Sequence, residues 1–343
     1  MLGYILKRLL LMIPTLLGAL TITFIVIQFV PGGPVETLMA EVRAGQGESS
    51  GYKAGRDSDA KQIAELKKLY GFDKPAHVRY VEMIGNFLRF DLGKSFLQNK
   101  DVWSLIKEKL PVSISLGLWT FVLSYLISVP LGVWKAVREG SRFDVLSSLV
   151  VLIGYAIPGF VLGLFLIVLF AGGSFYELFP LRGLTSDNWA DLSWPARIAD
   201  YLWHITLPLI CMVIGSFAIV TMLTKNTFVE EMRKQYVLVA RAKGLSQKRV
   251  LFKHIFRNAL IPLITGFPSA FIGAFFAGSV LIETLFSLDG LGLLSYESVV
   301  RRDYPVVLGS LYLFTLIGLV VKLVSDLLYV VVDPRVQFTS VGK

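Results

Sequence analysis

The sequence predicts an all-α membrane protein with six transmembrane helices. Of its 343 residues, 54% are hydrophobic and only 17% are charged, and the mean hydropathy is +0.64, which is too apolar for an ordinary soluble globule. Backbone groups cannot stay unpaired in hydrocarbon, so long apolar runs form helices there. The six runs are 9–30, 112–134, 144–170, 205–223, 259–283 and 306–332.

The first run follows Lys7 and Arg8, as the apolar part of a secretory signal would. A helix over 9–30 is about 33 Å long, enough to cross a bilayer. It is longer than the apolar part of a typical signal, and no small-x-small cleavage site follows it. We therefore expect a retained first transmembrane helix.

Basic residues near the ends of the runs predict the orientation of the chain. They gather at the N-terminus, in the 135–143 turn and in the 224–258 loop, which has nine Lys and Arg. Cytoplasmic loops carry such an excess, so both termini are expected in the cytoplasm. The extracytoplasmic parts are then 31–111, 171–204 and 284–305.

This orientation divides the chain into four parts. They are an N-terminus with the first helix (1–30), an extracytoplasmic helical subdomain (31–111), a five-helix core (112–332) and a cytoplasmic tail (333–343). Within the subdomain, the Gly-, Ser- and charge-rich stretch 43–58 predicts little fixed structure. Two apolar stripes predict helices: Ile63, Leu66, Leu69 and Tyr70, and then Val81, Ile84 and Leu88. The subdomain could contact a polar partner or substrate, or could cap the helix ends.

Several kinds of chemistry find no support in the sequence. Gly93-Lys94-Ser95 resembles the end of a phosphate-binding loop, but Leu88 stands where that motif needs its first glycine. The three histidines (His77, His204 and His254) have no acid or cysteine at a metal-ligand spacing, and Cys211 is expected to pack in a helix. We therefore expect a chain that is not an enzyme and binds no metal or cofactor itself.

Few charges fall inside the apolar runs. A proton-coupled carrier usually places carboxylates at the midplane of several spans, and this sequence offers almost none. Lys322 and Asp326 lie four residues apart on the last run, where they can share a helix face and pair. A structural pair and a gating role both remain open.

The basic loop contains a pattern typical of a short amphipathic helix. Apolar residues recur at helical spacing at Val229, Met232, Tyr236 and Val239. The acids Glu230 and Glu231 come early and the bases Arg241 and Lys243 late, an order that complements the helix dipole. Gly244 is placed to end this helix in a left-handed conformation, and Ser246 to cap the next one. An interfacial helix and a docking element are both consistent with this pattern.

Specific segments resemble those of ABC-importer permeases in the dipeptide/oligopeptide/nickel family. The segment Ala240-Arg241-Ala242-Lys243-Gly244-Leu245, followed by Lys253-His254 and Arg257-Asn258-Ala259-Leu260-Ile261-Pro262, resembles their coupling-helix region. Further resemblances are Pro31-Gly32-Gly33-Pro34, Tyr70-Gly71-Phe72-Asp73-Lys74-Pro75, Phe90-Asp91-Leu92-Gly93-Lys94-Ser95-Phe96, Arg302-Asp303-Tyr304-Pro305 and Val332-Asp333-Pro334-Arg335. The chain departs from the family pattern at Gly33, where an aspartate is common, and it has no glutamate at the expected place before Gly244.

The resemblance implies a type I importer permease, a multi-pass protein of the bacterial cytoplasmic (inner) membrane. Its partners would be a second permease, two ATPase subunits that bind ATP and Mg²⁺, and an extracytoplasmic substrate-binding protein. It also implies that the segment near 235–245 docks in an ATPase groove through Gln235, Tyr236, Val239, Ala240, Arg241, Ala242, Lys243, Gly244 and Leu245. Similarity to permeases of microcin C-type importers implies peptides or peptide-like compounds, including cell-wall-derived peptides, as cargo. The alternatives are a secondary transporter and a channel subunit without an ATPase.

Overall fold

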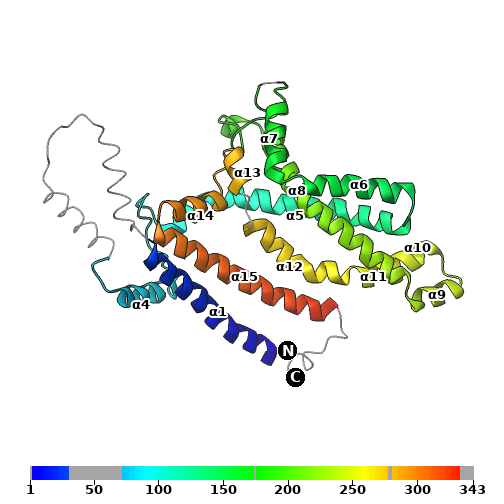
Figure 1. The fold of residues 1–343 in the computed structure, drawn as a ribbon, viewed down its shortest axis with the longest axis horizontal. Coiled ribbons are helices and arrows are strands. Elements are labelled where there is room, and N and C mark those ends of the chain that lie inside the picture. The colour runs from blue at the N-terminus through cyan, green and yellow to red at the C-terminus, as the bar shows by residue number, and fades with distance from the viewer. Residues whose placement is uncertain (1, 31–71, 174, 277–279, 333–343) are drawn as a thin grey trace. The chain divides into compact units, whose positions relative to one another are not determined.

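The computed structural model describes residues 2–30, 72–173, 175–276 and 280–332, and these parts are built from helices (Figure 1). These described parts contain no β-strand, only an isolated antiparallel β-bridge between Lys94 and Asp101. The helices are α1 (Leu2–Phe29), α4 (Ala76–Phe87), α5 (Val102–Val137), α6 (Arg142–Ala156), α7 (Gly159–Phe170), η1 (Trp189–Asp191), α8 (Trp194–Met232), α9 (Gln235–Ala242), α10 (Gln247–Arg249), η2 (Val250–Ile255), α11 (Phe256–Ala259), α12 (Ile261–Phe276), α13 (Val280–Leu285), α14 (Leu291–Val300) and α15 (Tyr304–Val332). The all-α class is confirmed.

Four helices and two bent helix pairs have the length and composition of membrane spans. The continuous ones are α1, α5, α8 and α15. One pair is α6 with α7, bent by 91°, and the other joins Gln247–Ala259 to Ile261–Gly273 with a bend of 47°. The six apolar runs of the sequence fall on these six elements.

The third run differs from the single straight helix expected over 144–170. It breaks at Ile157, whose backbone is extended with φ −85° and ψ 119°, because the ring of Pro158 disfavours a helical conformation in the residue before it. Gly159 then lies close to α8: a Cβ atom there would be 2.7 Å from the carbonyl oxygen of Cys211. Cys211 itself is buried, as expected.

The chain divides into two compact units, and the described part of the larger comprises 111–173, 175–276, 280–292 and 320–332. In it α5 and α8 approach closely, since a Cβ atom at Gly132 would lie 2.5 Å from the Cβ of Thr224. The hydroxyls of Ser124 and Ser216 are 2.9 Å apart along the same contact. Small residues of this kind let membrane helices pack backbone against backbone.

Of the described residues, the second unit comprises 2–30, 72–110 and 293–319. The helix expected around Val81, Ile84 and Leu88 is α4, which ends at Phe87; Val81 is 68% and Leu88 75% exposed. Phe87 is buried instead and packs on Tyr312, with ring centroids 5.0 Å apart. The expected stripe at 63–70 and the stretch 43–58 lie outside the described residues.

Candidate functional site

The first candidate site is the short helix α9, which follows α8 after two residues, Arg233 and Lys234. Glu231 at the end of α8 binds Lys234 and accepts a hydrogen bond of 2.7 Å from the hydroxyl of Tyr236. The stripe that the sequence suggested is therefore split, since Val229 belongs to α8 and Tyr236 to α9. The hydrogen bond to Glu231 raises the pKa of Lys234. Burial, followed by the hydrogen bond to Glu231, raises the pKa of Tyr236 to about 12.

Burial shows which side of α9 faces the protein. Val237 and Ala240 are buried in an apolar cluster with Phe228 of α8 and Ala136 of α5. Val239, which the periodicity placed on the apolar stripe, is 53% exposed. The expected inner face is therefore shifted, because the chain turns at 233–234 and restarts the helical phase at α9.

The end of α9 confirms the expectation for Gly244, whose φ is +80°. The N–H of Leu245 donates to the carbonyl of Ala240 at 3.3 Å, and the N–H of Gly244 donates to that of Arg241 at 2.9 Å. This pair of bonds is a Schellman motif, which a glycine at the left-handed position favours. Ser246 occupies the N-cap position of α10, but its side chain makes no capping hydrogen bond.

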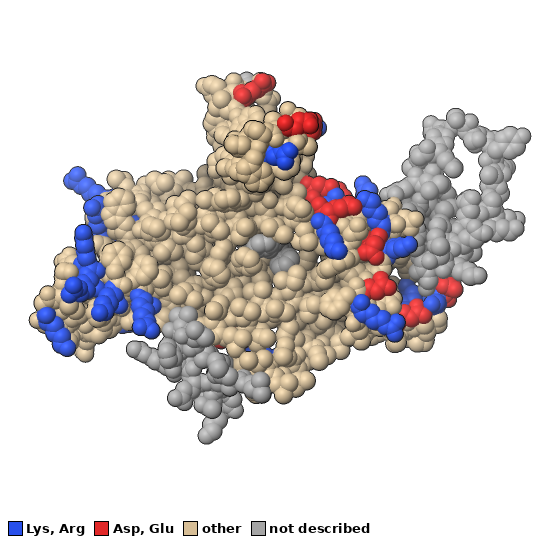
Figure 2. Space-filling view, turned by 180° about the vertical axis from the view of Figure 1, so that it is seen from behind, with Lys and Arg blue, Asp and Glu red and all other residues tan. Residues whose placement is uncertain are grey.

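Most of the candidate docking residues lie on the outside of this segment. Those exposed to solvent are Gln235, Val239, Arg241, Ala242, Lys243 and Gly244; Tyr236 and Leu245 are half-buried, and Ala240 is buried. Sequence reasoning missed Leu238, which is 60% exposed beside Val239. Basic side chains gather around α9 and α10 on the face seen in Figure 2, with few acidic ones beside them. We call Gln235, Leu238, Val239, Arg241 and Ala242 the α9 surface.

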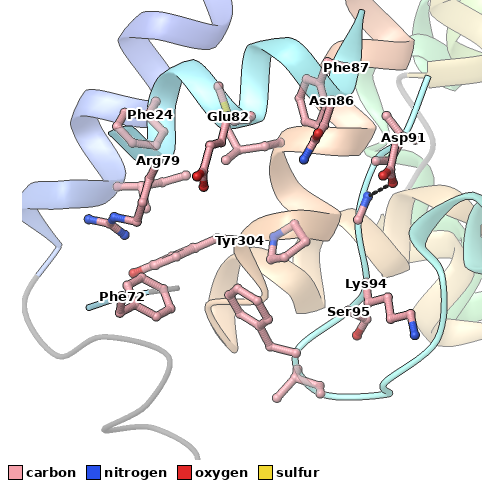
Figure 3. Close-up of a pocket in the computed structure, with 18 of the residues that line it drawn as sticks. Phe24, Phe72, Arg79, Glu82, Asn86, Phe87, Asp91, Lys94, Ser95 and Tyr304 are labelled. Atoms are coloured by element: carbon pink, nitrogen blue, oxygen red, sulfur yellow. Dashed lines mark hydrogen bonds between the residues drawn. The ribbon is translucent and has the colours of Figure 1, made fainter. Parts of the chain in front are cut away.

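The second candidate site is a cavity of about 880 Å³ in the smaller unit, lined by α1, α4, the 91–99 loop and the start of α15. Figure 3 shows Arg79 and Glu82 extending from α4 into it, beside Phe72 and Tyr304. The Arg79 guanidinium lies 4.9 Å from the centroid of the Phe72 ring and donates to the Gln28 side chain at 2.7 Å. Burial lowers the pKa of Arg79. Glu82 is bound to Lys74 at 2.7 Å, and none of the described carboxylates forms an ion pair with Arg79.

Two of the segments that carry the family resemblance meet beside this cavity. The hydroxyl of Ser95 and the N–H of Phe96 both donate to the carboxylate of Asp303, the second at 2.9 Å. Asp303 is only 3% exposed. Ser95, whose match to a phosphate-binding loop was rejected from the sequence, thus holds the 91–101 loop against the start of α15.

The remaining residues that the sequence singled out are placed as follows. Lys322 and Asp326 form the expected pair at 4.0 Å, with side chains 59% and 17% exposed. His204 is buried and bonds the carbonyl oxygen of Asp200 at 2.8 Å. Among the described residues, no group of three or more His, Cys, Asp or Glu could hold a metal.

Comparison with known proteins identifies the family. Residues 128–338 match the model of the binding-protein-dependent transport system inner membrane component. The chain is 54% identical to the peptidoglycan transport system permease protein YejB of Agrobacterium fabrum, with 98% of each chain covered. It is 53% identical to the inner membrane ABC transporter permease protein YejB of Escherichia coli O157:H7, covering 98% of this chain and 99% of the relative.

A more distant relative is the oligopeptide transport system permease protein AppB of Bacillus subtilis, 34% identical over 98% of this chain and all of the relative. These relatives are named as permeases, which agrees with a multi-pass inner-membrane subunit that does no catalysis itself. The family also implies ATPase and substrate-binding partners. The chain belongs to the family of inner membrane components of binding-protein-dependent transport systems.

Proposed function

We propose that this chain is a permease subunit of an ATP-driven importer of peptides or peptide-like compounds, and that α9 receives the movement of the ATPase. The observation that carries this proposal is the α9 surface. It presents Leu238 and Val239 to solvent on a helix whose other side is anchored by Val237 and Ala240. A surface that is apolar in the middle with a basic residue beside it is suited to a protein groove.

The proposed assembly has this chain beside a second homologous permease, with two ATPase subunits on the cytoplasmic side. Both termini and α9 lie on that side, as the distribution of Lys and Arg indicates. ATP and Mg²⁺ bind to the ATPase subunits. Closure of the ATPase pair moves α9, and the spans then change from an inward-facing to an outward-facing arrangement.

Cargo enters from the opposite side, where a substrate-binding protein delivers it. The cavity of the smaller unit belongs to this side in the proposed orientation, and Arg79 offers a cation there that pairs with none of the described carboxylates. Peptide-like cargo is supported by relatives that are named for peptidoglycan and oligopeptide transport. Cell-wall-derived and microcin C-like peptides are the cargo classes that we propose.

Purification of the tagged chain from cells tests this function. We expect a stable complex with a second permease and a P-loop ATPase, and a binding protein from the same cells that carries peptides. Scrambling residues 240–245 should uncouple ATP hydrolysis from uptake while the chain still inserts into the membrane. A lone chain that transports without an ATPase, or normal uptake by the scrambled variant, would refute the proposal.

A further inference from the structure

Three charged side chains form a buried cluster where α5, α6 and α8 meet. Lys135, near the end of α5, is 0% exposed. Its ammonium group donates to the carbonyl oxygen of Asp144 at 2.9 Å and to the hydroxyls of Ser147 and Ser148 at 2.7 and 2.8 Å. All three hydrogens of the ammonium group therefore have an acceptor on α6.

The Asp144 carboxylate joins the other parts of the cluster. One oxygen lies 3.2 Å from the Lys135 ammonium, and the other lies 2.7 Å from that of Lys225 on α8. The second oxygen also accepts the N–H of Gly140 in the turn between α5 and α6, at 3.1 Å. One carboxylate thus connects two helices, the turn between them and a third helix.

Membrane topology and stability alone do not account for this arrangement. A lysine that only marks the cytoplasmic end of a span extends its charge into water, whereas Lys135 is fully enclosed. Replacing buried ion pairs with apolar residues is often neutral or stabilising, so such pairs are weak evidence for a role in stability.

The helices that carry the cluster also carry the residues against which α9 packs. Ala136, next to Lys135, packs in the same apolar cluster as Phe228 of α8 and Val237 and Ala240 of α9. Lys225 is also on α8, seven residues before that helix ends at Met232. The ionic and apolar clusters therefore connect the α5–α6 pair to the helix that leads into α9.

We infer that Lys135, Asp144 and Lys225 are positioning residues that make the α5–α6 pair move together with α8 and α9 when the ATPase subunits close. The inference rests on the proposed function, because it describes how movement of α9 reaches the spans. It assigns a role in transmission to three side chains that contact neither ATP nor cargo.

The test uses the complete complex reconstituted in proteoliposomes and measures peptide imported per ATP hydrolysed. Lys225→Gln removes the charge at the most accessible member, whose side chain is 18% exposed, and Lys225→Arg keeps the charge. Asp144→Asn removes the central charge. Glu139→Gln is the matched control, since it breaks a pair with Arg233 in which both side chains are well exposed, at 43% and 71%.

We expect peptide per ATP to fall at least about fivefold in Lys225→Gln and Asp144→Asn, the lower end of typical coupling effects. ATP hydrolysis should persist, and Lys225→Arg and Glu139→Gln should keep the wild-type ratio. A wild-type ratio in Lys225→Gln overturns the inference. An equal loss of hydrolysis and uptake, or failure of Lys225→Gln to assemble, also overturns it, because these outcomes indicate a structural role. If the wild-type complex shows no ATP-driven import, the proposed function fails instead.

Discussion

Replacing Leu238 and Val239 with serine should weaken binding of the ATPase subunit without disturbing the fold. The two side chains are 60% and 53% exposed. Full burial of such a side chain is worth about 1.5–3 kcal/mol, so the exposed parts together leave about 2–3 kcal/mol to be gained in a groove. Their loss corresponds to about a thirty- to hundredfold weaker affinity.

Affinity would be measured by titrating purified ATPase subunits onto the permease pair in nanodiscs. Val81→Ser with Leu88→Ser is the matched control, because these residues are also a valine and a leucine, are 68% and 75% exposed, and lie on α4 and directly after its end. The control should bind ATPase subunits like the wild type. Unchanged affinity in the α9 variant, in a complex that assembles normally, would refute the assignment of this surface.

Three further substitutions test the local physical arguments. Gly244→Val should destabilise the end of α9 by about 1–2 kcal/mol, because φ is +80° and a β-branched residue resists that conformation. We expect this variant to import less peptide per ATP, whereas Gly244→Asn should be tolerated. Equal behaviour of the two variants would contradict the argument. Gly132→Ala should lower the thermal stability of the complex, because the new Cβ atom would collide with Thr224. Gly215→Ala should not lower it, since no atom lies within 4 Å of the Cβ position there. Equal melting temperatures of the two variants would exclude the close contact at Gly132. Asp303→Asn should weaken two charge-assisted hydrogen bonds, from Ser95 and Phe96, each worth about 1.5–3 kcal/mol. The 91–101 loop should then be cleaved faster by a protease. An unchanged cleavage rate would show that other contacts hold the loop.

The number and positions of the spans could be predicted because apolar length is a local property of the chain. The break in the third span was only partly visible, since Pro158 and Gly159 mark a weak point in a helix. The 91° bend is accompanied by close packing of Gly159 against Cys211 in α8, and a contact between distant segments leaves no periodic signal.

The candidate site shows the same division between local and distant determinants. Gly244 was predictable because a left-handed helix end is encoded at one position, and its φ of +80° agrees. The prediction of which face of α9 is buried was wrong, because it assumed one continuous helix through residues 233–234. Lys135 counted only as a topology signal, since its burial depends on Asp144 and on the serines of α6.

The most direct test of the account is peptide uptake into proteoliposomes that contain this chain, its partner permease and the two ATPase subunits, with the binding protein supplied at the outer face. We predict accumulation of labelled peptide that requires both ATP and the binding protein and that is lost when α9 carries serine at 238 and 239. Uptake that proceeds without ATP, or that is unchanged in the α9 variant, would contradict it.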